Sequence, residues 1–187
     1  MSIERKGIFK FAGQDMTVVG PDLQVGQPAP EFTVQANDWS ITKGLVSTHG
    51  KVRIIGSLSS LSTSVCDRET RHFNVEASAL GEGIVILMVS MDLPWTQKNW
   101  CGAAGAEKVI TLSDHQFADF GEKYGVLVKE QRILRRAIFV VDAKDQIVYA
   151  AYMPELKDEP NYPEVLAAAK RCLLSSAATA KATRTEV

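Results

Sequence analysis

The chain has 187 residues, a mass of 20.5 kDa and a formal net charge of −1. This length suits one ordinary domain, which can bury a sufficient core without disulfide or metal staples. The near-neutral charge gives no global attraction to nucleic acid or to an anionic membrane surface. The longest strongly apolar run, around Ile84 to Met91, is far shorter than the roughly 18 residues of a membrane span. We therefore expect neither nucleic acid nor a membrane as a partner.

The N-terminus, Met-Ser-Ile-Glu-Arg-Lys, has no apolar core leading to a cleavage site, so the sequence predicts no secretory signal. A cytoplasmic location is the resulting expectation. In a reducing compartment the three cysteines, Cys66, Cys101 and Cys172, do not predict a structural disulfide framework. Three interpretations remain for such cysteines: buried core residues, metal ligands or redox chemistry.

The chain begins with a predicted β-hairpin. Two short alternating segments surround a polar, glycine-containing turn between Gly7 and Val19. Three prolines and two glycines predict an extended segment over 20–30. Strands are expected at Phe32–Gln35 and Lys51–Leu58, and the apolar run Ile84–Ser90 suits a buried central strand.

Helical spacing appears between the predicted strands. Apolar residues at steps of seven, four and three predict a helix that begins near Val65 and carries Cys66 in its first turn, with Thr63 among the available caps. The remaining predicted elements are helices at 96–101, 115–124 and 162–174 and strands at 109–112, 137–141 and 146–152.

The order β-α-β-α-β-α-β-β-α implies a mixed sheet with helices on its faces. We therefore expect an α/β protein with a thioredoxin-like fold, extended at the N-terminus by the hairpin. One domain is expected over 1–174. Residues 175–187 have almost nothing to bury, which predicts a flexible C-terminal tail.

Cys66 is the cysteine whose position best suits chemistry. A thiol in the first turn of a helix faces unpaired N–H groups and the positive end of the helix dipole, and both favour the thiolate. Thr63, three residues earlier, can direct its hydroxyl to the same point. Because free cysteines are often buried core residues, position alone leaves that interpretation and the redox interpretation open.

The neighbouring residues favour redox chemistry. Thr63-Ser-Val-Cys66 resembles the Thr-x-x-Cys motif of the peroxiredoxins. Further segments resemble the thiol peroxidase subfamily in order and approximate spacing, so the resemblance covers the chain from near Ile8 to near Leu174. These segments are Arg71-His-Phe-Asn74, Val89-Ser-Met-Asp-Leu-Pro94, Trp100-Cys-Gly-Ala-Ala-Gly105, Val109-Ile-Thr-Leu112 and Arg136-Ala-Ile-Phe-Val-Val-Asp142.

The resemblance implies a thiol-dependent peroxidase and a role for each matched residue. Cys66 matches the peroxidatic cysteine, whose thiolate becomes a sulfenic acid. Thr63 matches the hydroxyl that holds the thiolate and the substrate oxygen. Arg136 matches the guanidinium that stabilises the thiolate and polarises the peroxide bond.

Cys101 matches the resolving cysteine of the subfamily. That cysteine forms an intramolecular disulfide, which a thioredoxin-type reductant reopens. A disulfide needs Cα atoms within about 7 Å, and the family reaches this by local unfolding, which Gly102 and Gly105 would ease.

The resemblance also implies hydrogen peroxide or organic hydroperoxides as substrates, and a homodimer.

Ser59 departs from the family pattern, in which a proline stands four residues before the threonine. Serine predicts a freer and wetter loop beside Cys66. Two alternatives therefore remain open: a thiol–disulfide exchange protein, and a redox sensor with weakened peroxidase activity. The cysteines are not in Cys-x-x-Cys spacing, which argues against the first, and only Ser59 argues for the second.

The other candidate residues predict structural roles. Cys172 lies in step with Val165 on the last predicted helix, as a core residue would. Arg71 either helps to hold the active-site helix or makes a surface ion pair. The scattered histidines form no zinc-binding group, and no phosphate loop or dinucleotide fingerprint is present. We expect no metal and no cofactor.

Overall fold

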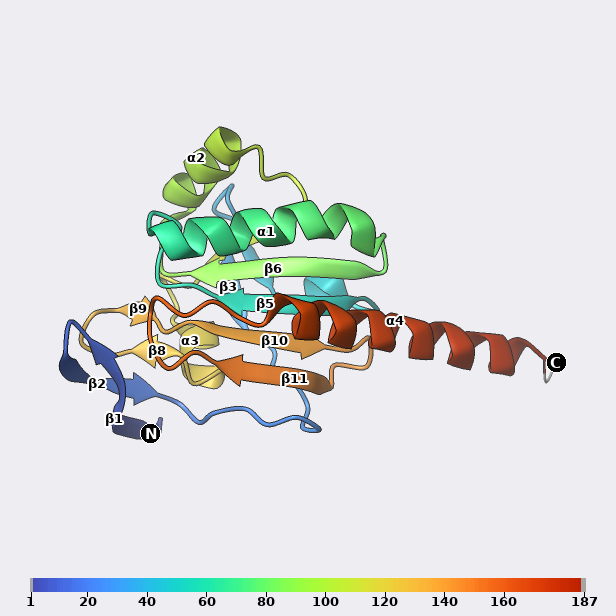
Figure 1. Ribbon diagram of the computed structural model, residues 1–187, viewed down its shortest axis with the longest axis horizontal. Coiled ribbons are helices and arrows are strands. Elements are labelled where there is room, and N and C mark those ends of the chain that lie inside the picture. The colour runs from blue at the N-terminus through green and yellow to red at the C-terminus, as the bar shows by residue number, and fades with distance from the viewer. Residues whose placement is uncertain (1, 186–187) are drawn as a thin grey trace.

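The computed structural model describes residues 2–185, apart from the side chains of Ser78 and of residues 176–185. A central sheet has the order β11-β10-β5-β6-β7-β3-β4, and a smaller sheet beside it has the order β1-β2-β8-β9 (Figure 1). The central strands are β3 (Thr33–Gln35), β4 (Ile41–Lys43), β5 (Val52–Ser57), β6 (Ile84–Ser90), β7 (Ile110–Ser113), β10 (Ala137–Val141) and β11 (Ile147–Tyr152). The strands of the smaller sheet are β1 (Glu4–Phe11), β2 (Gln14–Val19), β8 (Leu127–Val128) and β9 (Ile133–Leu134).

The helices of the described chain are α1 (Ser64–Leu80), α2 (Pro94–Ala104), α3 (Asp119–Lys123) and α4 (Tyr162–Thr185), with a 3-10 turn, η1, at Val46–Thr48. Helices α1 and α4 share one core with the central sheet, through Phe73 and Val165 among others. Helix α3 contributes Phe120 to the core on the opposite face. Helix α2 lies against β7 and above α1, at the edge of the fold (Figure 1).

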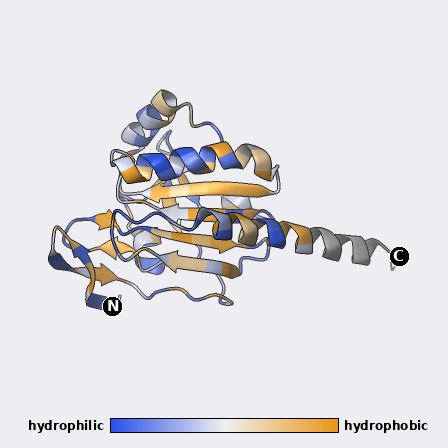
Figure 2. Ribbon diagram, in the orientation of Figure 1, coloured by the Kyte–Doolittle hydropathy of each residue, from blue (hydrophilic) through white to orange (hydrophobic). Residues whose placement is uncertain are grey.

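The middle strands of the central sheet are apolar because helices cover both faces. Every residue of β5 and β10 is buried, and β6 is coloured hydrophobic along its length in Figure 2. Strands β5 and β6 run parallel with Ser57 opposite Val89, so their carboxyl ends meet at one edge of the sheet. Strand β10 runs antiparallel to β5 with Ala137 opposite Ser57. Arg136, which precedes β10, therefore reaches the same edge.

The predicted alternation of strands and helices and the N-terminal hairpin are confirmed. The sequence did not predict β4, β8 or β9, because strands of two or three residues carry no readable alternation. Strand β8 pairs with β2 of the hairpin and with β9. The hairpin therefore belongs to the smaller sheet, and the segment between Val126 and Arg136 completes that sheet.

Helix α3 is shorter than predicted. It begins at Asp119 instead of His115, because Asp114 accepts a hydrogen bond from the backbone N–H of Gly121 (2.7 Å) and closes a turn ahead of the helix. Ala118 then takes a left-handed conformation with φ of 54°, which interrupts any helix through it. A buried carboxylate thus overrides the helical pattern of the sequence.

Helix α2 is longer than predicted and has recognisable ends. It begins at Pro94, whose fixed φ suits a first helical turn, instead of residue 96. It extends past Cys101 to Ala104, where Gly105 takes the left-handed conformation that commonly follows a helix.

Helix α4 continues beyond the predicted end at Leu174 to Thr185 and projects from the body of the protein (Figure 1). Alanine is frequent in this extension and favours a helix without buried contacts. The flexibility expected over 175–187, like the domain boundary at 174, stays a prediction, and residues 186–187 lie outside the described part. Within residues 2–185 no helix has both the length and the apolarity needed to cross a membrane.

Gly20 fixes the hairpin against the rest of the chain. Its N–H donates to the carbonyl of Ile3 (2.8 Å), and its φ of +88° lies in the left-handed region. A Cβ built on Gly20 would lie 1.7 Å from the carbonyl oxygen of Glu122 in α3. Because that oxygen is backbone, a side chain at this position displaces either the hairpin or the helix.

We expect Gly20→Ala to lower the free energy of unfolding by about 3 kcal/mol, because it combines a left-handed φ with a backbone clash. Gly13→Ala is the matched control: Gly13 has a φ of +80° but open space around its Cβ position, so we expect a loss of about 1 kcal/mol. Equilibrium urea unfolding measures both. Equal losses would contradict the proposed contact between Gly20 and α3.

Candidate active site

The loop between β5 and α1 is held in place by a carboxylate at the end of β6. Asp92 accepts hydrogen bonds from the Ser60 hydroxyl (2.7 Å), the Leu61 backbone N–H (2.8 Å) and the Ser90 hydroxyl (2.9 Å). These bonds tie the loop to the neighbouring strand. The start of α1 is therefore fixed relative to the sheet edge where Arg136 arrives.

Cys66 lies in the first turn of α1, as predicted, and is 0% exposed. Its Sγ accepts a hydrogen bond of 3.2 Å from Nη2 of Arg136, which is 1% exposed. The same nitrogen donates to the carbonyl of Leu156 (3.1 Å). The thiol thus lies between the unpaired N–H groups of a helix start and a permanently charged guanidinium, the surroundings that reactive cysteines commonly have.

Glu69 is a third member of the site, and the sequence analysis did not identify it. It lies one turn after Cys66, is fully buried, and accepts a hydrogen bond from Nη1 of Arg136. Burial raises the pKa of Glu69 to about 7, against the opposing effect of Arg136 and with a smaller contribution from Glu159. The sequence could have indicated Glu69, because an acidic residue three positions after Cys66 lies on the helix face that carries the thiol.

Arg136 therefore faces two groups that can each become an anion. When Glu69 is protonated, the guanidinium charge is available to a Cys66 thiolate. When Glu69 is ionised, its carboxylate takes up part of that charge in the buried site. Glu69 and the Cys66 sulfur thus compete for the same guanidinium.

Thr63 and Arg136 line a common pocket of about 210 Å³ beside Cys66. The Thr63 hydroxyl donates to the carbonyl of Ser60 (3.0 Å) and makes no hydrogen bond that caps α1. Thr63 is exposed and lines the pocket, whereas Cys66 is buried and does not line it. The full lining consists of Ser59, Thr63, Val65, Arg136, Leu156 and Lys157.

Ser59 is buried and hydrogen-bonded, contrary to the expectation of a freer and more hydrated loop. Its side chain is buried, with 7% of the residue exposed, and its hydroxyl donates to the carbonyl of Leu134 in β9 (3.0 Å). A proline has no side-chain donor and could not make this bond. This hydrogen bond attaches the active-site loop to the smaller sheet and restrains it where the family pattern has a proline ring.

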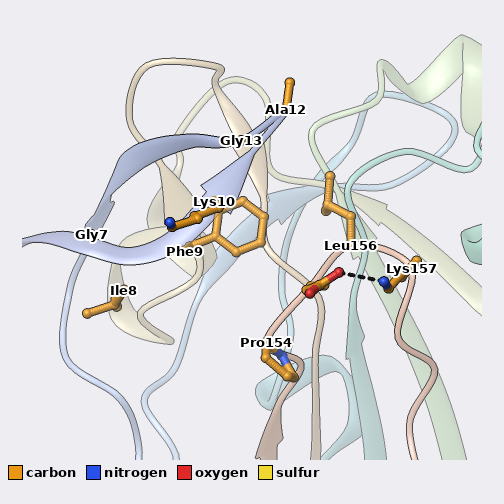
Figure 3. A pocket seen from close by; sticks show the side chains of 10 residues that line it. Gly7, Ile8, Phe9, Lys10, Ala12, Gly13, Pro154, Leu156 and Lys157 are labelled. Carbon is orange, nitrogen blue, oxygen red and sulfur yellow. Dashed lines mark ion pairs between the residues drawn. The ribbon is translucent and has the colours of Figure 1, made fainter.

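A larger hollow of about 580 Å³ lies between the N-terminal hairpin and the segment 154–157 (Figure 3). Ile8, Phe9 and Leu156 give it apolar walls, and Lys157 forms an ion pair with Glu155 at its rim (2.9 Å). Leu156 and Lys157 also line the smaller pocket. The two hollows therefore adjoin.

Cys101 is not beside Cys66. It is half-buried in α2, and its Sγ lies 3.3 Å from the Thr111 hydroxyl in β7. Arg136, the partner of Cys66, precedes β10, and β5 and β6 separate β10 from β7. The two sulfurs thus contact different partners, which come from strands three positions apart in the sheet, and both cysteines are free thiols. A bond between them requires movement of α1, α2 or both.

Cys172 is partly buried and packs against the core between α4 and the sheet, as predicted. Burial raises the pKa of its thiol, which disfavours reaction as a thiolate. Among residues 2–185 no group of three or more His, Cys, Asp or Glu side chains is arranged to hold a metal ion.

The sequence pattern of the Redoxin family matches residues 24–166. A thiol peroxidase of Oceanobacillus iheyensis is 49% identical over 156 residues, which cover 83% of this chain and 94% of the relative. A thiol peroxidase of Bacillus subtilis is 46% identical over 160 residues, 86% of this chain and 95% of the relative. The chain belongs to the thiol peroxidases of the Redoxin family. It is therefore a thiol-dependent peroxidase, an oxidoreductase.

Solved structures agree with the fold described above. A peroxiredoxin-like protein from Aquifex aeolicus is 36% identical, with a TM-score of 0.80 over 91% of this chain and 98% of that one. A thiol peroxidase from Chromobacterium violaceum, at 19% identity and a TM-score of 0.73 over 84% of this chain and 92% of that one, shares the fold. The expected thioredoxin-like α/β fold is confirmed.

We expect Glu69→Gln to raise the rate constant with peroxide above about pH 7 and to change it little at lower pH, where Glu69 is protonated. Above the Glu69 pKa of about 7 the carboxylate competes for Arg136, and glutamine keeps an acceptor for Nη1 without the charge. The second-order rate constant with hydrogen peroxide, measured across neutral pH, tests this.

The matched control is Glu76→Gln, the same substitution about two turns further along α1, for which we expect the wild-type profile. Tyr162 and Glu159 also face Glu69 and stay unchanged in both variants. Superimposable profiles for Glu69→Gln and the wild type would show that Glu69 does not compete with Cys66.

Proposed function

We propose that this thiol peroxidase reduces hydrogen peroxide and organic hydroperoxides through Cys66, with Cys101 as the resolving cysteine and a thioredoxin-type protein as the reductant. The contact of 3.2 Å between Arg136 Nη2 and Cys66 Sγ, in the first turn of a helix, carries this proposal. It joins a nucleophile to the fixed positive charge that activates it.

In the first step the Cys66 thiolate attacks one peroxide oxygen. The O–O bond breaks, an S–O bond forms, and the departing oxygen takes a proton and leaves as water or an alcohol. Cys66 becomes a sulfenic acid. The forked guanidinium of Arg136 can stabilise negative charge on both sulfur and oxygen, and the Thr63 hydroxyl, in the same pocket, can hold the substrate oxygen.

In the second step the Cys101 thiol attacks the sulfenic sulfur, and the S–S bond forms as water leaves. A dithiol reductant then exchanges with this disulfide, which returns two thiols to the enzyme and leaves the reductant oxidised. Trp100, which precedes Cys101 in α2, donates to Asp67, which follows Cys66, and this neighbourhood supports Cys101 as the second thiol. Burial raises the pKa of the Cys172 thiol, which argues against that residue.

Two adjoining hollows support a substrate range beyond hydrogen peroxide. The pocket beside Thr63 suits a peroxide group, and the larger hollow at the hairpin offers apolar walls from Ile8, Phe9 and Leu156. An organic hydroperoxide could bind with its peroxide group near Arg136 and its apolar part in the hollow.

We further propose a homodimer and a cytoplasmic location. Support for the dimer is the resemblance to the subfamily, and support for the location is the N-terminal sequence. The sensor alternative depended on a loosened loop at Ser59, and the hydrogen bond from Ser59 to Leu134 removes that support. The thiol–disulfide exchange alternative does not account for the buried Arg136 beside Cys66.

We expect one equivalent of hydrogen peroxide to convert the reduced protein to a Cys66–Cys101 disulfide, identified by mass spectrometry of proteolytic fragments. Cys66→Ser should abolish this rapid oxidation. Cys101→Ser should retain it and accumulate sulfenic acid or an intermolecular disulfide, because no resolving thiol remains. Cys172→Ser, the matched control, should behave as the wild type. A disulfide that forms equally well in Cys66→Ser would refute the proposed chemistry.

A further inference from the structure

Three polar side chains on one face of α1 bind the segment that carries Cys101. Asp67, Arg71 and Asn74 are spaced by four and three residues, which places them along a single helix face. The Asp67 carboxylate accepts a hydrogen bond from the Trp100 indole N–H (2.9 Å). Arg71 donates to the carbonyl of Ala104 (3.3 Å), the last residue of α2.

The third bond follows the end of α2. Asn74 Oδ1 accepts the backbone N–H of Lys108 (2.8 Å). Arg71 also supports the bond between Asp67 and Trp100. Its Nε donates to both carboxylate oxygens of Asp67 (3.0 Å each), and its guanidinium lies 5.5 Å from the centre of the Trp100 ring. The bonds from Arg71 and Trp100 keep the pKa of the Asp67 carboxyl below its usual value against the effect of burial.

These bonds are next to both cysteines. Asp67 directly follows Cys66, and Trp100 directly precedes Cys101. While the bonds hold, Cys101 stays beside Thr111 of β7, and Cys66 stays beside Arg136 at the start of β10. A disulfide between the two sulfurs therefore requires the bonds from α1 to the segment 100–108 to break first.

We propose that Asp67, Arg71 and Asn74 form a clamp on α2, and that release of this clamp sets the rate at which Cys101 resolves the Cys66 sulfenic acid. The inference rests on the proposed function, because it concerns the second step of that reaction. These three are positioning residues: they act on Cys101 through its helix and need no contact with peroxide.

The bonds of the clamp are weak enough to break in each catalytic cycle. They lie at the partly exposed surface between two helices, where water can replace them, unlike the fully buried pair of Arg136 and Glu69. The side of the site formed by the sheet thus stays folded while α2 is released. Local opening of this kind draws on elements with solvent-accessible hydrogen bonds.

The clamp also sets the lifetime of the sulfenic acid. While α2 is held, a second peroxide can oxidise Cys66–SOH to the sulfinic acid, with transfer of one oxygen and release of water or an alcohol. Faster release favours the disulfide over this second oxidation. The same bonds therefore determine how readily excess peroxide inactivates the enzyme.

The test is a rapid-mixing experiment in which the full-length reduced protein meets hydrogen peroxide and is quenched at intervals, with sulfenic acid, disulfide and sulfinic acid measured by mass spectrometry. We expect Trp100→Phe, which keeps an aromatic ring but removes the donor to Asp67, to form the disulfide about tenfold faster from the sulfenic acid. The fraction of sulfinic acid at high peroxide should fall in proportion.

The controls separate the clamp from general destabilisation. Trp95→Phe is the same substitution on the same helix, at a tryptophan that is 63% exposed and contacts Trp39 rather than α1, and it should match the wild type. Asn74→Ala should accelerate resolution by roughly threefold, whereas Asn74→Asp, which keeps an acceptor for the Lys108 N–H, should restore the wild-type rate.

Unchanged or slower disulfide formation in both Trp100→Phe and Asn74→Ala would overturn the clamp. Equal acceleration in Trp95→Phe would do the same, because it would reveal an effect of loosening α2 in general. A failure of the proposed function would give a different result. The wild-type protein would then form no sulfenic acid at Cys66 before any disulfide.

Discussion

The buried guanidinium of Arg136 is the interaction on which the rest of the site depends. One side chain with a single charge contacts the Cys66 sulfur, the Glu69 carboxylate and the Leu156 carbonyl. A buried charge must be paired and hydrogen-bonded to be tolerated. The helix start, the pocket wall and the Cys66 sulfur are therefore linked through one residue.

The sheet supplies the rigid half of the site and α2 supplies the releasable half. Antiparallel pairing of β10 with β5 brings Arg136 to the edge where α1 begins, and Arg136 and Cys66 are both buried there. Helix α2 is held to α1 through side chains at a partly exposed surface. This division suits a reaction that needs a fixed nucleophile in one step and a mobile second thiol in the next.

Much of this arrangement was predictable from the sequence, for physical reasons that differ between elements. The apolar stripe of α1 and the apolar run of β6 identify the core, and matched motifs single out Cys66 and Arg136, which the structure brings into contact. The pairing of Glu69 with Arg136 depends on strand register, and the anchoring of Ser59 depends on β9, a strand of two residues. Neither feature leaves a periodic signal, so tertiary contacts alone reveal them.

The most direct test replaces the guanidinium of Arg136 with the single ammonium group of lysine. In a Cys101→Ser background, where only the first step can occur, the second-order rate constant of Cys66 with hydrogen peroxide would be compared between Arg136 and Arg136→Lys, with circular dichroism to verify folding. Lysine keeps the charge but cannot bind sulfur and Glu69 in the same geometry. We expect a loss of at least about tenfold with lysine. Equal rate constants in two folded proteins would contradict it.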